Sequence, residues 1–211
     1  MTIAGSPYTG EMNLLRIFPT VVSYTKNFLN EIEIDLLLKM SEDGKTKKPL
    51  NDSQQEAQSD GWYSSYELFY PGGILKDLKL KSPSLYDKIE NHLNIHADAV
   101  GYPEQSITNS WFNVQQKNSV LFEHLHADSI LSGGLYLKVD ENSSKLYFHD
   151  AHPYKQMDPE GNMTELNQKL QCVNPEVGMI VLFPSWLKHS SNNEKNQTND
   201  RTVISFNSKN K

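Results

Sequence analysis

Short apolar and aromatic runs separated by turn residues fill the sequence from residue 110 onward, and they limit the fold more than any other feature. The runs cover residues 111–114, 119–122, 134–139, 146–148, 179–183 and 202–206. Runs of this length and spacing are typical of an all-β sandwich or barrel, because alternating strands and helices would require longer amphipathic segments between them. We therefore expect the second half of the chain to form a β-core.

The first half of the chain has a different pattern. Apolar residues recur at helical spacing in residues 27–40 and 85–99, and a β-branched and aromatic segment at 14–24 predicts a strand. The polar segments 41–59 and 150–173 are predicted to be loops. We expect a mainly β protein with N-terminal helices, in a single domain over residues 1–211. Residues 1–108 would be roughly the helical support and residues 109–207 the β-core.

The composition excludes several kinds of site and makes some partners unfavourable. The chain has 211 residues, a net charge of -6 and a single cysteine, Cys172. The acidic balance makes nucleic acid an unfavourable partner, and one cysteine excludes an intramolecular disulfide framework or a cysteine-rich zinc site. The longest strongly apolar run, residues 179–183, is far too short to span a membrane, and no leader pattern opens the sequence. We expect a cytoplasmic protein of unknown oligomeric state.

The first candidate site is a run of alternating metal-binding residues. His124, His126 and Asp128 would point to one face of an extended chain. Imidazole and carboxylate ligands together suit a divalent ion such as Fe(II), Zn(II) or Mn(II). The alternative is a solvated polar strand end.

Two later residues complete a pattern with this run. His189 follows the apolar run 179–183 and Pro184, and Arg201 begins another strand 12 residues later. A site with two histidines and one carboxylate binds one face of octahedral Fe(II) and leaves three positions for a 2-oxo acid and dioxygen. Arg201 could bind the distal carboxylate of a dicarboxylic oxo acid, because a planar guanidinium binds carboxylates bidentately. A surface histidine and a surface arginine are the alternatives.

These motifs resemble those of the 2-oxoglutarate- and Fe(II)-dependent oxygenase superfamily, and more narrowly a bacterial and phage branch of uncharacterised members. The resemblance implies a double-stranded β-helix, a cupin-like jelly-roll that holds iron at its open end. The segments that carry it are NSWFN (109–113), HLHADS (124–129), SGGLYL (132–137), FPSWLKH (183–189) and RTVISFN (201–207).

The resemblance also implies roles for individual residues. His126 and Asp128 would be the first ligand pair, His189 the distal ligand, and Arg201 the anchor of the 2-oxoglutarate C5 carboxylate. This branch usually has His-x-His, so His124 with His126 is a second register for the first pair, although the carboxylate register gives the usual charge balance for Fe(II). Further contacts to 2-oxoglutarate are implied for Ser205, Tyr136 and Asn113.

The implied activity is that of a dioxygenase that binds Fe(II), 2-oxoglutarate and O2. It would hydroxylate a small molecule or a protein side chain while 2-oxoglutarate is converted to succinate. Two alternatives remain open: a non-catalytic jelly-roll that binds a metal or ligand, and a zinc hydrolase of the metallo-β-lactamase type, whose site also begins with His-x-His-x-Asp. The all-β pattern disfavours the zinc hydrolase.

Overall fold

The helices lie in the first half of the chain, together with two short strands, and the other strands follow. The computed structural model describes residues 19–43, 62–64, 73–152, 154, 157–159, 161–162, 164 and 167–211. Within these residues the helices are α1 (Glu31–Asp43), α3 (Gly73–Lys81) and α4 (Pro83–Ala99). The strands are β1 (Ser23–Thr25), β2 (Trp62–Ser64), β3 (Gln105–Gln115), β4 (Leu131–Lys138), β5 (Leu146–His149), β6 (Leu170–Val173), β7 (Ile180–Pro184), β8 (His189–Ser190) and β9 (Arg201–Asn210).

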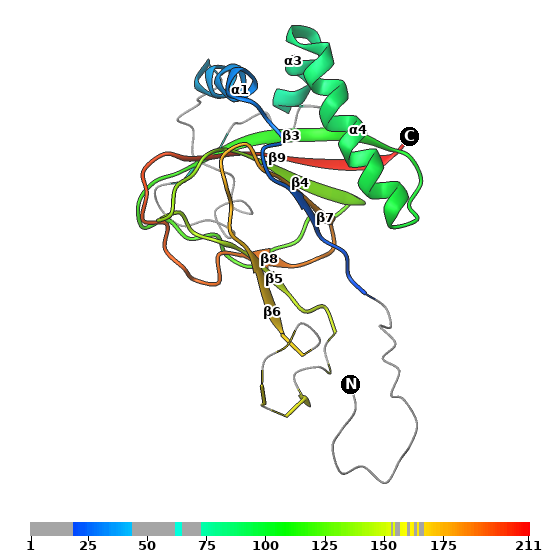
Figure 1. Cartoon of the computed structure of the whole chain (residues 1–211), viewed down its shortest axis with the longest axis vertical. Coiled ribbons are helices and arrows are strands. Elements are labelled where there is room, and N and C mark those ends of the chain that lie inside the picture. The colour runs from blue at the N-terminus through cyan, green and yellow to red at the C-terminus, as the bar shows by residue number, and fades with distance from the viewer. Residues whose placement is uncertain are drawn as a thin grey trace.

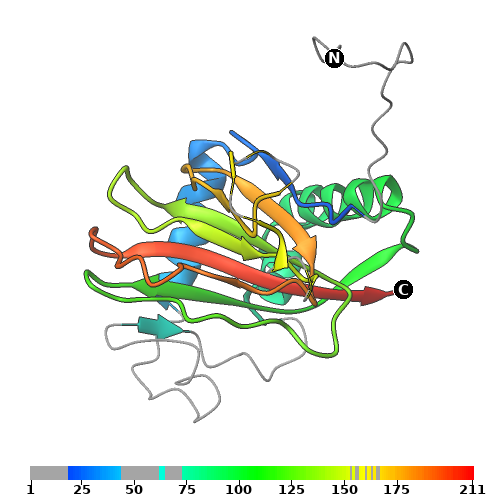
Figure 2. The same ribbon diagram turned by 90° about the horizontal axis from the view of Figure 1, so that it is seen from below.

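The strands form two antiparallel sheets. The larger sheet has the order β1-β7-β4-β9-β3-β2, and the smaller sheet has the order β6-β5-β8. Figure 1 shows the three helices on one side of the larger sheet and β5, β6 and β8 on the other. Figure 2 shows the strands of the larger sheet running side by side. This arrangement confirms the predicted mainly β class and the double-stranded β-helix.

Alternation along the strands divides the core into two layers. On β9, Ile204 and Phe206 belong to the layer beneath the helices, together with Leu135 of β4. Their neighbours Val203 and Tyr136 belong to a second layer, between the two sheets. Because successive side chains of a strand point to opposite faces, one face of β9 supports the helices and the other faces the interior between the sheets. We call this second face the inner face.

Local sequence features explain where α1 and α4 begin and how α4 packs. At the start of α1, the Asn30 side chain accepts the Glu33 backbone N–H at 2.9 Å and the Glu33 carboxylate accepts the Asn30 N–H at 2.8 Å. This reciprocal capping box satisfies two backbone donors that the helix cannot. Pro83 occupies the first turn of α4, and the apolar side chains of α4 that face the sheet are buried: Leu85, Ile89 and Leu93.

Most predicted elements are present, with shifts at their ends. The helix predicted at 27–40 begins at Glu31, and the strand predicted at 14–24 is found only as β1, because residues 14–18 lie outside the described residues. Residues 119–122 do not form a strand. The loop predicted at 41–59 lies outside the described residues after α1 ends, and the loop predicted at 150–173 ends in β6. None of the helices in the described part of the chain is long and apolar enough to cross a membrane.

Candidate active site

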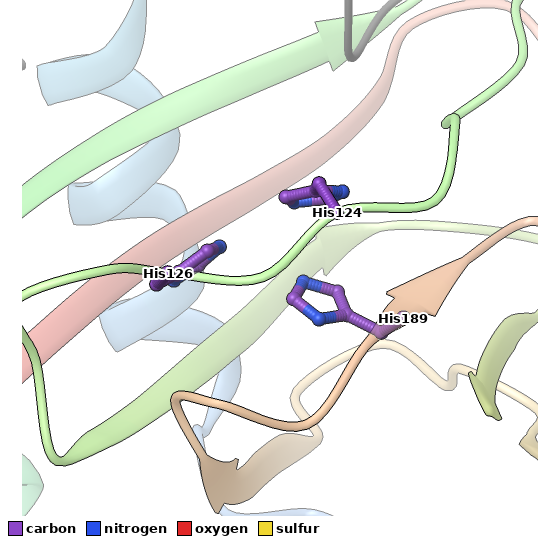
Figure 3. A group of neighbouring side chains, drawn as sticks. All are labelled: His124, His126 and His189. Carbon is purple, nitrogen blue, oxygen red and sulfur yellow. The ribbon is translucent and has the colours of Figure 1, made fainter. Parts of the chain in front are cut away.

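Three histidines from two segments meet between the sheets. His124 and His126 lie in the segment that precedes β4, and His189 opens β8. Backbone hydrogen bonds hold the segments together: His124 N–H donates to the His189 carbonyl at 3.1 Å, and His189 N–H donates back at 3.0 Å. One ligand nitrogen from each imidazole lies within 4.8 Å of the others. Figure 3 shows the three rings gathered around one region. We call this group the histidine cluster.

The turn after β7 fixes where the third ring lies. Pro184 ends the strand, and its carbonyl accepts the Leu187 N–H at 2.9 Å, which closes a turn. Within this turn the Ser185 carbonyl accepts the His126 N–H at 2.9 Å. The turn therefore positions His189 and also binds the segment that contains His124 and His126.

In all three rings Nδ1 is hydrogen-bonded to an oxygen atom and Nε2 is left to bind a metal. His124 Nδ1 lies 2.9 Å from the Phe122 carbonyl, and His189 Nδ1 lies 3.0 Å from the Leu187 carbonyl. His126 Nδ1 lies 2.6 Å from Asn207 Oδ1. A carbonyl oxygen can only accept, so each Nδ1 carries the proton and each Nε2 keeps its lone pair. Histidines that bind metals commonly donate their second nitrogen in this way, and the cluster therefore fits a divalent ion.

Burial keeps the three imidazoles neutral. Burial, together with the neighbouring His124, lowers the pKa of His126 to about 4. Burial also lowers the pKa of His124, and it takes the pKa of His189 well below the usual value. Neutral imidazole is the form that binds a metal, so the cluster offers three ready donors near pH 7.

Asp128 does not join the histidine cluster. The chain turns at residues 127–128, Asp128 has a positive φ of 57°, and its side chain is exposed. The expected alternation to one face required an extended chain through this residue, and the turn interrupts it. The side chains that the structure brings together are His124, His126 and His189, and the exposed Asp128 is not among them.

Arg201 lies on the inner face of β9 with little access to solvent. The residue is 6% exposed, and its guanidinium donates to Gln115 Oε1 of β3 and lies 5.4 Å from the centre of the Tyr136 ring. The Arg201 Nε and the Gln115 Nε2 have no hydrogen-bond partner among the described residues. We call Arg201, Gln115 and Tyr136 the guanidinium cluster.

The guanidinium cluster contains a buried cation that forms no ion pair among the described residues, although Glu194 interacts with it electrostatically. Burial lowers the pKa of Arg201, and burial raises the pKa of Tyr136. Among the residues that the structure describes, no carboxylate forms an ion pair with Arg201. An isolated buried charge is costly, and a bidentate carboxylate would use the unpaired donors. The cluster thus has the features of a carboxylate-binding site.

One row of inner-face residues links the two clusters. Between Arg201 and Asn207, β9 presents Val203 and Ser205 to the inner face, and Ser205 Oγ accepts the Asn113 side-chain amide at 3.1 Å. Trp111 of β3 pairs with Ser205, and its ring lies 5.6 Å from the His126 ring. The predicted Ser205 of β9 and Asn113 of the adjacent β3 therefore lie between Arg201 and Asn207, the residue bonded to His126.

Aromatic rings cover the histidine cluster on other sides. The Phe183 ring lies 4.7 Å from the His189 ring, and the Phe148 ring lies 6.3 Å from it. These apolar rings lower access for water. They explain why burial dominates the pKa shifts of the histidines.

The sequence patterns did not single out Gln115, Asn207, Ser132 or Ser185. Amides and hydroxyls on strands have no spacing motif of their own. The available signal was alternation, since Asn207 follows Arg201 by an even number of residues on a strand, and Gln115 follows Asn113 by two.

Comparisons with known proteins agree with this architecture. Residues 109–207, a little under half of the chain, match the family model described as "Putative 2OG-Fe(II) oxygenase". No curated protein matches the sequence. An oxidoreductase of the 2OG-Fe(II) oxygenase family from Burkholderia pseudomallei is 14% identical, with a TM-score of 0.59 over 90% of this chain and 83% of that one.

Two further solved structures share the fold at low identity. A Pseudomonas putida prolyl-4-hydroxylase is 14% identical, with a TM-score of 0.53 over 91% of this chain and 94% of that one. HygX from Streptomyces hygroscopicus, solved with nickel, 2-oxoglutarate and hygromycin B, is 12% identical, with a TM-score of 0.56 over 90% of this chain and 83% of that one. The predicted resemblance to the 2-oxoglutarate- and Fe(II)-dependent oxygenases is thus confirmed, by the family model over residues 109–207 and by the fold that the chain shares with these solved structures.

Proposed function

We propose that this protein is a mononuclear Fe(II)- and 2-oxoglutarate-dependent dioxygenase. The observation that carries the proposal is the presence, in one molecule, of a three-imidazole cluster and a buried guanidinium that forms no ion pair among the described residues. The first fits a divalent metal, and the second fits the distal carboxylate of 2-oxoglutarate. Neither a structural metal nor an isolated surface arginine accounts for both.

We propose His124, His126 and His189 as the metal ligands. Their Nδ1–H groups are each held by an oxygen acceptor, so that three Nε2 lone pairs remain for the ion. When bound, Fe(II) would supply the centre at which O2, 2-oxoglutarate and a substrate C–H bond give succinate, CO2 and a hydroxylated product. Three neutral ligands leave the positive charge of the metal undiminished, which favours a dianionic co-substrate.

The remaining residues bind and shield 2-oxoglutarate. Arg201 would bind the C5 carboxylate through its unpartnered Nε, and Gln115 would donate its free Nε2 hydrogen to the same carboxylate. Tyr136 packs on the guanidinium and limits its movement. Ser205 and Asn113 would contact the body of the molecule from the strands between the two clusters.

Anaerobic reconstitution tests the function directly. Adding Fe(II) and then 2-oxoglutarate should produce the visible charge-transfer absorbance of a chelated 2-oxo acid, and admitting O2 should release succinate. Absence of both the absorbance and succinate would reject the oxygenase. Absorbance without any succinate would favour a binding module.

A pair of variants tests the ligand assignment. His124→Ala should lose stoichiometric iron, whereas Asp128→Asn should retain it, since the Asp128 side chain is exposed and outside the cluster. Asparagine also tolerates the positive φ at this position, so the backbone is preserved. Loss of iron in Asp128→Asn with retention in His124→Ala would restore the carboxylate register.

A further inference from the structure

His126 differs from the other two histidines in what orients its ring. His124 and His189 each donate Nδ1–H to the backbone carbonyl two residues earlier, at 2.9 and 3.0 Å. That contact is local and survives any change of neighbouring side chain. Within the described part of the chain His126 Nδ1 has no such backbone acceptor, and it contacts side chains from two strands instead.

Buried polar side chains form the support of His126. Asn207 Oδ1 of β9 lies 2.6 Å from His126 Nδ1, and Ser132 Oγ of β4 lies 2.9 Å from it. Ser132 also donates to Asn207 Oδ1 at 2.7 Å, and its oxygen lies 2.7 Å from Ser185 Oγ. The three supporting residues are 0–6% exposed. A buried network of this kind is fully satisfied only when His126 donates to it.

We propose that Asn207 is a positioning residue that fixes the tautomer and orientation of His126, with Ser132 and Ser185 holding the amide in place. The amide oxygen takes two donors, His126 Nδ1–H and the Ser132 hydroxyl, which directs the amide group so that it accepts from the imidazole. The inference rests on the proposed function, because the Nδ1–H tautomer matters only if His126 Nε2 binds a metal.

The neutral charge of Asn207 has a second consequence. A carboxylate at this position would accept the same proton more strongly, raise the basicity of the imidazole and place a negative charge beside the metal. Metal affinity would rise, but a dianionic 2-oxo acid would be repelled. An amide keeps the orientation and leaves the site positive for the co-substrate.

The test compares Asn207→Ala and Asn207→Asp with the wild type. Ser208→Ala is the matched control, because Ser208 is a buried polar residue of the same strand whose hydroxyl bonds Gln105 and the Leu131 carbonyl and no histidine. The readouts are the dissociation constant for Co(II), the anaerobic dissociation constant for 2-oxoglutarate, and the urea midpoint of the metal-free protein.

The proposal predicts a specific order of affinities. Asn207→Ala should weaken Co(II) binding about 10–100-fold, as loss of a partner to a ligating histidine does elsewhere, and Asn207→Asp should restore or exceed wild-type affinity. Asn207→Asp should at the same time weaken 2-oxoglutarate binding, whereas Ser208→Ala should change neither affinity. Equal Co(II) affinity in Asn207→Ala and wild type, or no rescue by Asn207→Asp in a folded variant, would overturn the positioning role.

A spectroscopic readout separates this inference from the proposed function. In metal-free protein labelled with 15N-histidine, all three cluster residues should show the Nδ1–H tautomer, and in Asn207→Ala only His126 should become a tautomer mixture. An unchanged His126 tautomer in a folded Asn207→Ala variant would overturn the inference while leaving the metal site intact. Failure of the wild type to bind any divalent metal would overturn the proposed function as well.

Discussion

Replacing Arg201 by methionine tests whether this residue binds 2-oxoglutarate or stabilises the fold. A structural buried ion pair loses about 3–5 kcal/mol of stability when one partner is removed. Arg201 has no carboxylate partner among the described residues, and its Nε is unpaired. Arg201→Met therefore removes the cost of a buried charge, at the expense of leaving Gln115 Oε1 without its donor. We expect the two effects to offset each other, so the metal-free protein should change by only about 1 kcal/mol.

The same substitution should have a large effect on 2-oxoglutarate. A bidentate guanidinium–carboxylate contact supplies two charge-assisted hydrogen bonds, each of about 1.5–3 kcal/mol. Loss of about 3 kcal/mol raises the dissociation constant for 2-oxoglutarate roughly a hundredfold. Iron binding should be unchanged, because Arg201 does not belong to the histidine cluster.

Two measurements on each variant suffice. Anaerobic titration of the Fe(II) protein with 2-oxoglutarate gives the affinity, and urea unfolding of the metal-free protein gives the free energy of unfolding. Lys138→Met is the control for a change of charge near the strand end, because Lys138 is exposed and ion-paired with Asp200 at 3.6 Å. A loss of 3–5 kcal/mol on unfolding with unchanged 2-oxoglutarate affinity would show that Arg201 is structural.

The remaining predictions concern pH and packing. Because burial lowers the pKa of His126 to about 4 while an unfolded histidine titrates near 6.5, the unfolded state binds more protons between these values. The metal-free protein should therefore lose stability as the pH falls from about 6.5 to about 4, and the loss should be smaller in His126→Gln. Urea unfolding across this range checks the prediction, and the same fall in midpoint for both proteins would contradict it. Gly133→Ala should cost about 1–3 kcal/mol, since its Cβ would lie 2.4 Å from the Phe206 ring, whereas Gly161→Ala, with open space around the Cβ, should cost little. Urea unfolding at pH 7 checks this pair, and equal midpoints would contradict the overpacking.

Periodicity in the sequence was sufficient for much of the fold. The apolar spacing of Leu85, Ile89 and Leu93 identified α4, and the short runs identified β4, β5, β7 and β9. Local patterns succeed there because burial on one face imposes a regular period. The helix α3 and the strand β6 were not predicted. Residues 119–122 have the composition of a strand but do not form one; Ser119 and Leu121 accept isolated backbone hydrogen bonds from Asn196 and Ser191 instead.

The sequence by itself determined which chemistry was available. It contains His124 and His126 in one segment, His189 in a later one, an arginine at the start of a β-strand and a single cysteine. This combination favours an N/O metal site and offers a cation for an anionic ligand. Alternation also placed Arg201 and Val203 on one face of their strand, as the structure has them.

Only the tertiary structure decided which residues meet. Whether His124 or Asp128 lies beside His126 and His189 depended on whether the chain stays extended through residue 128; the chain turns there, with a positive φ, and His124 is the residue that lies beside them. Asn207 reaches His126, and Gln115 reaches Arg201, through pairings between strands that are far apart in the sequence. Such contacts depend on register and on the turn after Pro184, which are properties of the folded chain and not of any local pattern.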